Sequence, residues 1–149
     1  MDLNEEAFVL RNIPMFSSLD SSKLKLLAFA SDEMTFEAGE ELFRSGDAAD
    51  CAYVVLDGEV DIVIDLTSDN QVSLVRGKNE LIGEMGIISN APRSATVRAR
   101  TTVKALRISA ELFIKLLREN ADLALSVMRQ LSHKLAVATQ EIGEAALSK

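Results

Sequence analysis

Cysteine and histidine are almost absent from this chain of 149 residues, since each occurs once, as Cys51 and His133. A structural zinc site and an iron–sulfur cluster both need several such ligands, so the sequence excludes them. One cysteine permits no internal disulfide. Cys51 lies in the apolar run C-A-Y-V-V-L, where we expect a small core residue. His133 lies close to Arg129 and Lys134 on a predicted helix, and we expect it to be solvated.

Long apolar runs and excess positive charge are also lacking. No run is long enough to span a bilayer, and Asp2, Glu5 and Glu6 argue against a signal peptide. Together with the lone cysteine, this predicts a cytoplasmic protein. The chain has 16 lysines and arginines against 23 aspartates and glutamates, a net charge of -7. Because binding to a phosphate backbone needs a basic face, we expect neither a nucleic acid partner nor a membrane.

Length and composition predict one globular domain spanning residues 1–149. Hydrophobic residues make up 48% of the chain and charged residues 26%, as in soluble globular proteins. The pattern divides the domain into helices at 1–30, a β-rich region at 31–108 and further helices at 109–149.

The β-rich region consists of short apolar runs separated by turns that contain glycine, aspartate or asparagine. Gly39, Gly46 and Gly58 are expected at hairpin corners with positive φ. Many short strands at this spacing predict a sandwich or barrel. The predicted strands are residues 34–36, 42–43, 53–56, 60–66, 72–75, 95–99 and 103–108.

Two helices are predicted before the strands. Residues 3–12 form a short amphipathic helix that ends at Ile13-Pro14. The second helix begins at Asp20 or Ser21, either of which is a suitable cap.

Two more helices are predicted after the strands. Ser109 caps the first, and Asn120 separates it from a final helix of residues 122–147. The final helix carries apolar residues at alternating spacings of three and four, which predicts a heptad seam and self-association as a parallel two-fold pair. The seam residues are Met128, Leu131, Leu135, Ala138, Ile142 and Ala145.

Residues 81–97, L-I-G-E-M-G-I-I-S-N-A-P-R-S-A-T-V, contain the parts of a small anion site. Gly83 can adopt a positive φ and lets a ligand approach the main chain. If residues 84–88 form one or two helical turns, the first N–H groups point outward without partners. Arg93 follows a turn, and its guanidinium fork suits phosphate oxygens, to which Ser94 can add a hydroxyl.

Glu84 needs a separate explanation, because a carboxylate repels a phosphate unless another part of the ligand donates hydrogen bonds to it. Sugar hydroxyls would do so. A ligand with a phosphate for Arg93 and a ribose hydroxyl for Glu84 is a nucleotide. The alternative is that Glu84 and Arg93 pair with each other and the glycines serve only as turns.

Residues 82–96 resemble the phosphate-binding cassette of cyclic-nucleotide-binding domains, which occur in bacterial catabolite activator proteins and in regulatory subunits of cAMP-dependent protein kinase. The matching residues are Gly83, Glu84, Gly86, Arg93, Ser94 and Ala95, with Ile82 where an aromatic residue is commoner. The earlier runs G-E-x-L-F-R-x-G-D and Y-V-V-L-D-G-E-V resemble the first half of the same fold. The resemblance implies a mainly β protein, a double-stranded β-helix (jelly roll) barrel with N-terminal helices and a long C-terminal helix.

The resemblance also implies roles for individual residues. Glu84 takes the ribose 2′-hydroxyl, Arg93 with Ser94 takes the cyclic phosphate, and Thr139 on the long helix faces the purine beside Ala138. Amides near Gly83 complete the cradle. The expected ligand-binding residues are Ile82, Gly83, Glu84, Met85, Gly86, Arg93, Ser94, Ala95 and Thr139, with no metal or catalytic residues.

The sequence therefore predicts a non-catalytic regulatory or sensor domain for a cyclic nucleotide, cAMP first and cGMP second. It would need no cofactor and would signal through its C-terminal helix, as a homodimer or to a protein partner. No nucleophile, base and orienting group occur together, which argues against an enzyme.

Two alternatives stay open. The first is a jelly-roll scaffold or interaction protein that binds no nucleotide. The second follows from the family's transcription factors, in which a helix-turn-helix follows the long helix. None is found in this sequence, so the chain would be either a freestanding regulator or the effector-domain fragment of a longer transcription regulator.

Overall fold

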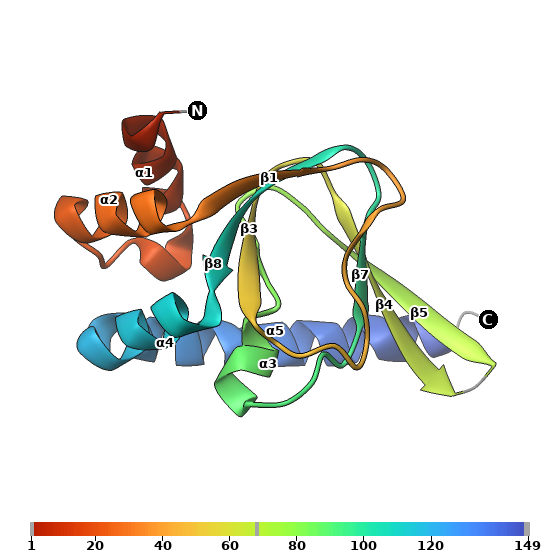
Figure 1. Ribbon diagram of the computed structural model, residues 1–149. Helices are drawn as coiled ribbons and strands as arrows, with labels where there is room; N and C mark the ends of the chain where they lie inside the picture. The colour runs from red at the N-terminus through yellow and green to blue at the C-terminus, as the bar shows by residue number, and fades with distance from the viewer. Residues whose placement is uncertain (1, 68, 148–149) are drawn as a thin grey trace.

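The computed structural model describes residues 2–67 and 69–147. Its centre is a jelly-roll barrel of two four-stranded antiparallel sheets (Figure 1). One sheet has the order β1-β8-β3-β6 and the other β2-β7-β4-β5. The strands are β1 (Asp32–Phe36), β2 (Glu41–Phe43), β3 (Cys51–Asp57), β4 (Val60–Thr67), β5 (Asn70–Arg76), β6 (Leu81–Ile82), β7 (Thr96–Ala99) and β8 (Val103–Ser109).

The predicted strands are confirmed, with one addition. β6 has only two residues and was not predicted, because so short an apolar run carries no readable alternation. It pairs with β3, where Ile82 lies opposite Tyr53, and it leads directly into α3 (Glu84–Ser89). This short strand therefore fixes the start of the predicted cassette to the barrel wall.

β3 is buried on both faces and joins two apolar cores. Ala52, Val54 and Leu56 point toward the helices, whereas Tyr53 and Val55 point into the barrel. The alternation has a period of two, as a strand requires, and both faces are covered, so the run is continuously apolar. β3 is thus the layer shared by the barrel core and the helical core.

The N-terminal helices pack together beside the barrel, at the upper left of Figure 1. α1 (Leu3–Arg11) is capped by Asp2, and α2 (Ser21–Ala30) by Asp20, whose side chain accepts a hydrogen bond from the Lys23 amide. Of the two caps that the sequence offered, Asp20 is therefore the one used. A short 3-10 helix, η1 (Pro14–Phe16), lies between them and was not predicted.

The C-terminal helices pack into the same apolar cluster as the N-terminal helices, against β3 and β8. α4 (Ala110–Glu119) is capped by Ser109, which accepts from the Leu112 amide, and Asn120 ends it, as predicted. α5 (Ala121–Leu147) runs along the bottom of the barrel in Figure 1 and reaches β5 of the β4–β5 hairpin. Within the described residues, no helix combines the length and apolar character needed to cross a bilayer.

Phe113 on α4 is fully buried in the helical core, whereas Phe29 on α2 is 76% exposed. Phe113→Ala is expected to lower the free energy of unfolding by about 3–5 kcal/mol, since it removes buried surface and leaves a cavity. Phe29→Ala, the matched control, is expected to change it by less than about 0.5 kcal/mol. Urea unfolding measures both, and equal losses would contradict the packing of α4.

Candidate ligand-binding site

Glu84 and Arg93 are the two charged residues buried in the part of the chain that the structure describes, with 3% and 4% exposure. Removing a charge from water is unfavourable by several kcal/mol unless partners compensate for it. These are also the two residues that the sequence placed at the centre of the site.

The main chain holds the two side chains in place. Gly83 has φ 87° and ends β6, so that Glu84 begins α3, and Asn90 with φ 53° ends that helix. After the turn, the Arg93 amide donates to the Asp47 carbonyl, and the Gly46 amide donates to the Arg93 carbonyl, each at 2.8 Å. The loop between β2 and β3 thereby fixes the backbone of Arg93.

Glu84 does not pair with Arg93, contrary to the alternative interpretation of the sequence. Its ion-pair partner is Lys134 on α5, whose ammonium lies 2.5 Å from the Glu84 Oε2. The same ammonium donates to the Leu81 carbonyl at 2.6 Å. Lys134 therefore ties α5 to the start of the cassette.

Arg93 bonds mainly to backbone carbonyls. Its Nη1 donates to the Gly83 carbonyl at 2.7 Å, and its Nη2 donates to the Cys51 carbonyl at 2.5 Å. The guanidinium carbon lies 3.9 Å from the ring centroid of Phe43, a cation–π geometry. Phe43 in turn stacks on Tyr53, with centroids 6.5 Å apart. These contacts orient the guanidinium without neutralising it.

Among the residues that the structure describes, no close anion balances the charge of Arg93. The nearest carboxylate, Asp50, is 4.0 Å from Nη2 and its side chain is 72% exposed. The Cys51 sulfur lies 3.6 Å from Nη2, but burial raises the pKa of this thiol, which is therefore neutral at pH 7. The Nε of Arg93 is buried and has no hydrogen-bond partner. The guanidinium has donors to spare for an anion.

A cavity of about 260 Å³ opens between the cassette, the inner wall of the barrel and α5. Most of its wall is apolar, and its charged residues are Glu84, Arg76 and Lys134. Seven of the nine residues expected at the ligand site line it, namely Ile82, Gly83, Glu84, Met85, Gly86, Ser94 and Ala95.

The other two expected residues do not line this cavity. Arg93 lies behind Gly83, since a Cβ on Gly83 would come within 2.6 Å of the Arg93 Nη1. Thr139 is exposed on α5, and Ala138 faces the cavity instead. A contact between Thr139 and a ligand stays a prediction.

Sequence reasoning missed Lys134 and Arg76. Lys134 precedes Ala138 by four residues, so it lies on the same face of α5, and this spacing was the available signal. Arg76 is the last residue of β5 and forms an ion pair with Glu141 of α5. No local sequence pattern indicates this pairing.

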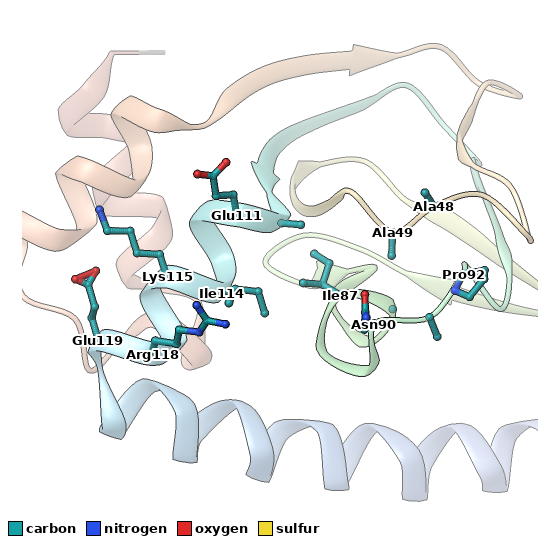
Figure 2. A pocket seen from close by; sticks show the side chains of 13 residues that line it. Ala48, Ala49, Ile87, Asn90, Pro92, Glu111, Ile114, Lys115, Arg118 and Glu119 are labelled. Atoms are coloured by element: carbon teal, nitrogen blue, oxygen red, sulfur yellow. The ribbon is translucent and has the colours of Figure 1, made fainter.

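A second and larger cavity, of about 780 Å³, lies on the far side of α3, against α4. Ile114 and Arg118 extend from α4 toward α3, whereas Lys115 and Glu119 extend away (Figure 2). Its charged residues are all exposed, and neither Glu84 nor Arg93 lines it. The smaller cavity is therefore the better ligand site, because it alone of the two contains a buried charge.

Among the described residues, no cluster of histidine, cysteine, aspartate or glutamate is suited to a metal ion. The polar groups of the smaller cavity instead offer a carboxylate acceptor, two cations and, behind Gly83, a guanidinium with an unused donor.

Comparisons with known proteins bear on this site. The sequence model of the cyclic nucleotide-binding domain matches residues 33–120, more than half of the chain. The cAMP-dependent protein kinase regulatory subunit of Emericella nidulans is 34% identical over 108 residues, which cover 72% of this chain and 26% of that protein. The chain thus spans about a quarter of the length of this curated relative.

Solved structures share the fold. The sensor domain of the transcriptional regulator DNR from Pseudomonas aeruginosa has a TM-score of 0.80 and 25% identity, with 93% of this chain and 94% of that chain covered. The regulatory subunit of a cAMP-independent protein kinase A from Trypanosoma brucei has a TM-score of 0.75 and 28% identity, covering 88% and 48%. All three proteins are described as regulatory or sensor molecules.

Gly83 allows a direct test of the cassette geometry. Gly83→Ala places a methyl group at positive φ and within 2.6 Å of the Arg93 Nη1, whereas Gly39→Ala has the same φ problem with open space around it. Gly39→Ala is expected to lower the free energy of unfolding by about 1 kcal/mol and Gly83→Ala by at least about 2 kcal/mol. Urea unfolding gives the difference, and equal losses would mean that Arg93 does not lie against Gly83.

Tyr53 is the only tyrosine, so its ultraviolet titration reports one residue. Burial, followed by the nearby Cys51, raises its pKa from 10.0 to about 12. The folded state therefore holds a proton that the unfolded state loses, and stability is expected to fall as the pH rises from 10 to 12. Tyr53→Phe should remove this part of the fall. A phenolate that appears at pH 10 in the folded protein would contradict the burial of Tyr53.

Proposed function

Because the chain belongs to the cyclic nucleotide-binding domain family, we propose that it is a non-catalytic sensor that binds a cyclic nucleotide, with cAMP as the first candidate and cGMP as the second. The regulatory and sensor character of the similar proteins supports this proposal. So does the name of the fungal relative, a cAMP-dependent regulatory subunit.

The observation that carries the proposal is the state of Arg93. Arg93 is 4% exposed and its Nε has no partner, and no carboxylate of the described residues comes closer than the 4.0 Å of Asp50. This guanidinium therefore favours an anion as its ligand. A cyclic phosphate has one negative charge and oxygens that match the guanidinium fork. It would neutralise this charge at the edge of the adjoining cavity.

Arg93 has to turn for this contact. It gives up its bonds to the Gly83 and Cys51 carbonyls, while Phe43, which also lines the cavity, stays beside it. Glu84 accepts from the ribose 2′-hydroxyl, and Ser94 adds a donor to the phosphate. The apolar wall formed by Ile62, Ile64 and Leu74 receives the rest of the ligand.

The signal passes to α5, which closes one side of the cavity. Ligand shifts the population of α5 positions through contacts that differ between the bound and the free states. Thr139 meets the purine after that shift. The exposed apolar residues Met128 and Leu135, at 60% and 52% exposure, form the homodimer contact along α5. The domain works in the cytoplasm.

A second candidate is favoured by one comparison. The Trypanosoma brucei subunit has this fold and is described as cAMP-independent. A chain with the same jelly roll that answers to no cyclic nucleotide would act as an interaction protein through its helices. The presence or absence of binding separates the two candidates.

Calorimetric titration with cAMP and cGMP tests the proposal. We expect a dissociation constant near micromolar, about −8 kcal/mol, for the preferred nucleotide. Arg93→Ala is expected to weaken binding at least about 100-fold, because it removes the phosphate ligand, and Arg93→Lys about tenfold, because it keeps the charge without the fork.

The matched control is Arg98→Ala, which removes an exposed arginine from β7 and should leave affinity unchanged. Circular dichroism shows whether each variant is folded. Failure of the wild-type chain to bind either nucleotide would overturn the proposed sensor function and favour the second candidate, an interaction protein that binds no nucleotide.

A further inference from the structure

The two halves of α5 are held to the rest of the domain in different ways. In the first half, Leu123 and Val127 are at most 2% exposed and belong to the helical core. Leu131 is only partly buried, and beyond it no described residue of the helix is buried. Apolar packing therefore anchors the first half and contributes little along the second.

Two ion pairs hold the second half instead. Lys134 pairs with Glu84 of the cassette, and Glu141 pairs with Arg76 of β5 through Nη2 at 3.0 Å. The two helix residues are seven positions apart, two turns, so they face the barrel together. Both cations, Lys134 and Arg76, line the cavity.

From these contacts we propose that Lys134 is an internal competitor for the ligand at Glu84. The Glu84 carboxylate is the acceptor that the proposed ligand requires, and the Lys134 ammonium already occupies its Oε2. A hydroxyl that binds Glu84 must displace this ammonium. The inference rests on the proposed function, because it assigns Lys134 a role at the same site.

Displacement of Lys134 has a structural consequence. Lys134 also loses the Leu81 carbonyl, so of the two ion pairs described here only the one between Glu141 and Arg76 is left. The cavity of about 260 Å³ lies below the range of about 300–1,000 Å³ usual for ligand pockets, and release of the helix enlarges it. The apparent affinity for the ligand is then the intrinsic affinity multiplied by the fraction of molecules in which Lys134 does not occupy Glu84.

The first experiment needs no nucleotide. Hydrogen exchange is measured on the whole chain for the wild type, Lys134→Met and Lys104→Met, the control that removes an exposed lysine from β8. Lys134→Met is expected to speed exchange about tenfold at residues 131–147 and to leave residues 121–127 unchanged. Equal protection in all three proteins would overturn the role of Lys134 in holding the helix, whether or not the chain binds a nucleotide.

The second experiment measures affinity for cAMP and cGMP. Lys134→Met is expected to bind the preferred nucleotide about tenfold more tightly, which corresponds to about 1.4 kcal/mol, while Lys104→Met stays at the wild-type value. Weaker binding by Lys134→Met would mean that Lys134 contacts the ligand directly and would overturn the competition.

Glu141→Gln separates competition from simple loosening of the helix. It breaks the ion pair with Arg76 and leaves Lys134 on Glu84, so affinity should stay within about twofold of wild type. A gain equal to that of Lys134→Met would attribute the effect to helix release and overturn the competition at Glu84. If no protein binds either nucleotide, the proposed function fails, and the exchange experiment alone decides how α5 is held.

Discussion

The rest of the site depends on the burial of two opposite charges that do not meet. Glu84 follows Gly83 in the chain and the Arg93 guanidinium lies against Gly83, and each side chain is held by a different part of the fold. Glu84 receives a cation from α5, whereas Arg93 receives carbonyls from β3 and the cassette. Had the two paired directly, each would have neutralised the charge of the other and neither would need a ligand. Because they do not, the guanidinium lacks an anion and the carboxylate is tied to a distant helix.

The fold was largely predictable from local patterns. Short runs of alternating polarity predicted the strands, and caps such as Asp20 and Ser109 predicted the helix starts. Both signals come from residues only a few positions apart in the chain. β6 and η1 were not predicted, since two or three residues cannot show a period.

The candidate site was predictable where its residues are contiguous. Gly83, Glu84 and Ser94 lie together at the cavity because one strand, one short helix and one turn carry them. Contacts between distant segments carry no such signal. The direction of Arg93 depends on the Cys51 carbonyl, 42 residues away, and the partner of Glu84 comes from 50 residues further along the chain. Both follow from how α5 and β3 pack, which the sequence pattern alone does not specify.

The helical core extends beyond the segment that defines the family. Phe16, Leu24 and Leu27 from the N-terminal helices share one apolar cluster with Leu123 and Val127 of α5. Residues 33–120, which match the family model, contain only the middle of this cluster. A recombinant fragment trimmed to those limits would keep α4 but would lose the apolar residues that α1, α2 and α5 pack against the outer face of β3 and β8. The minimal expressible unit therefore begins with α1 and includes at least the first two turns of α5.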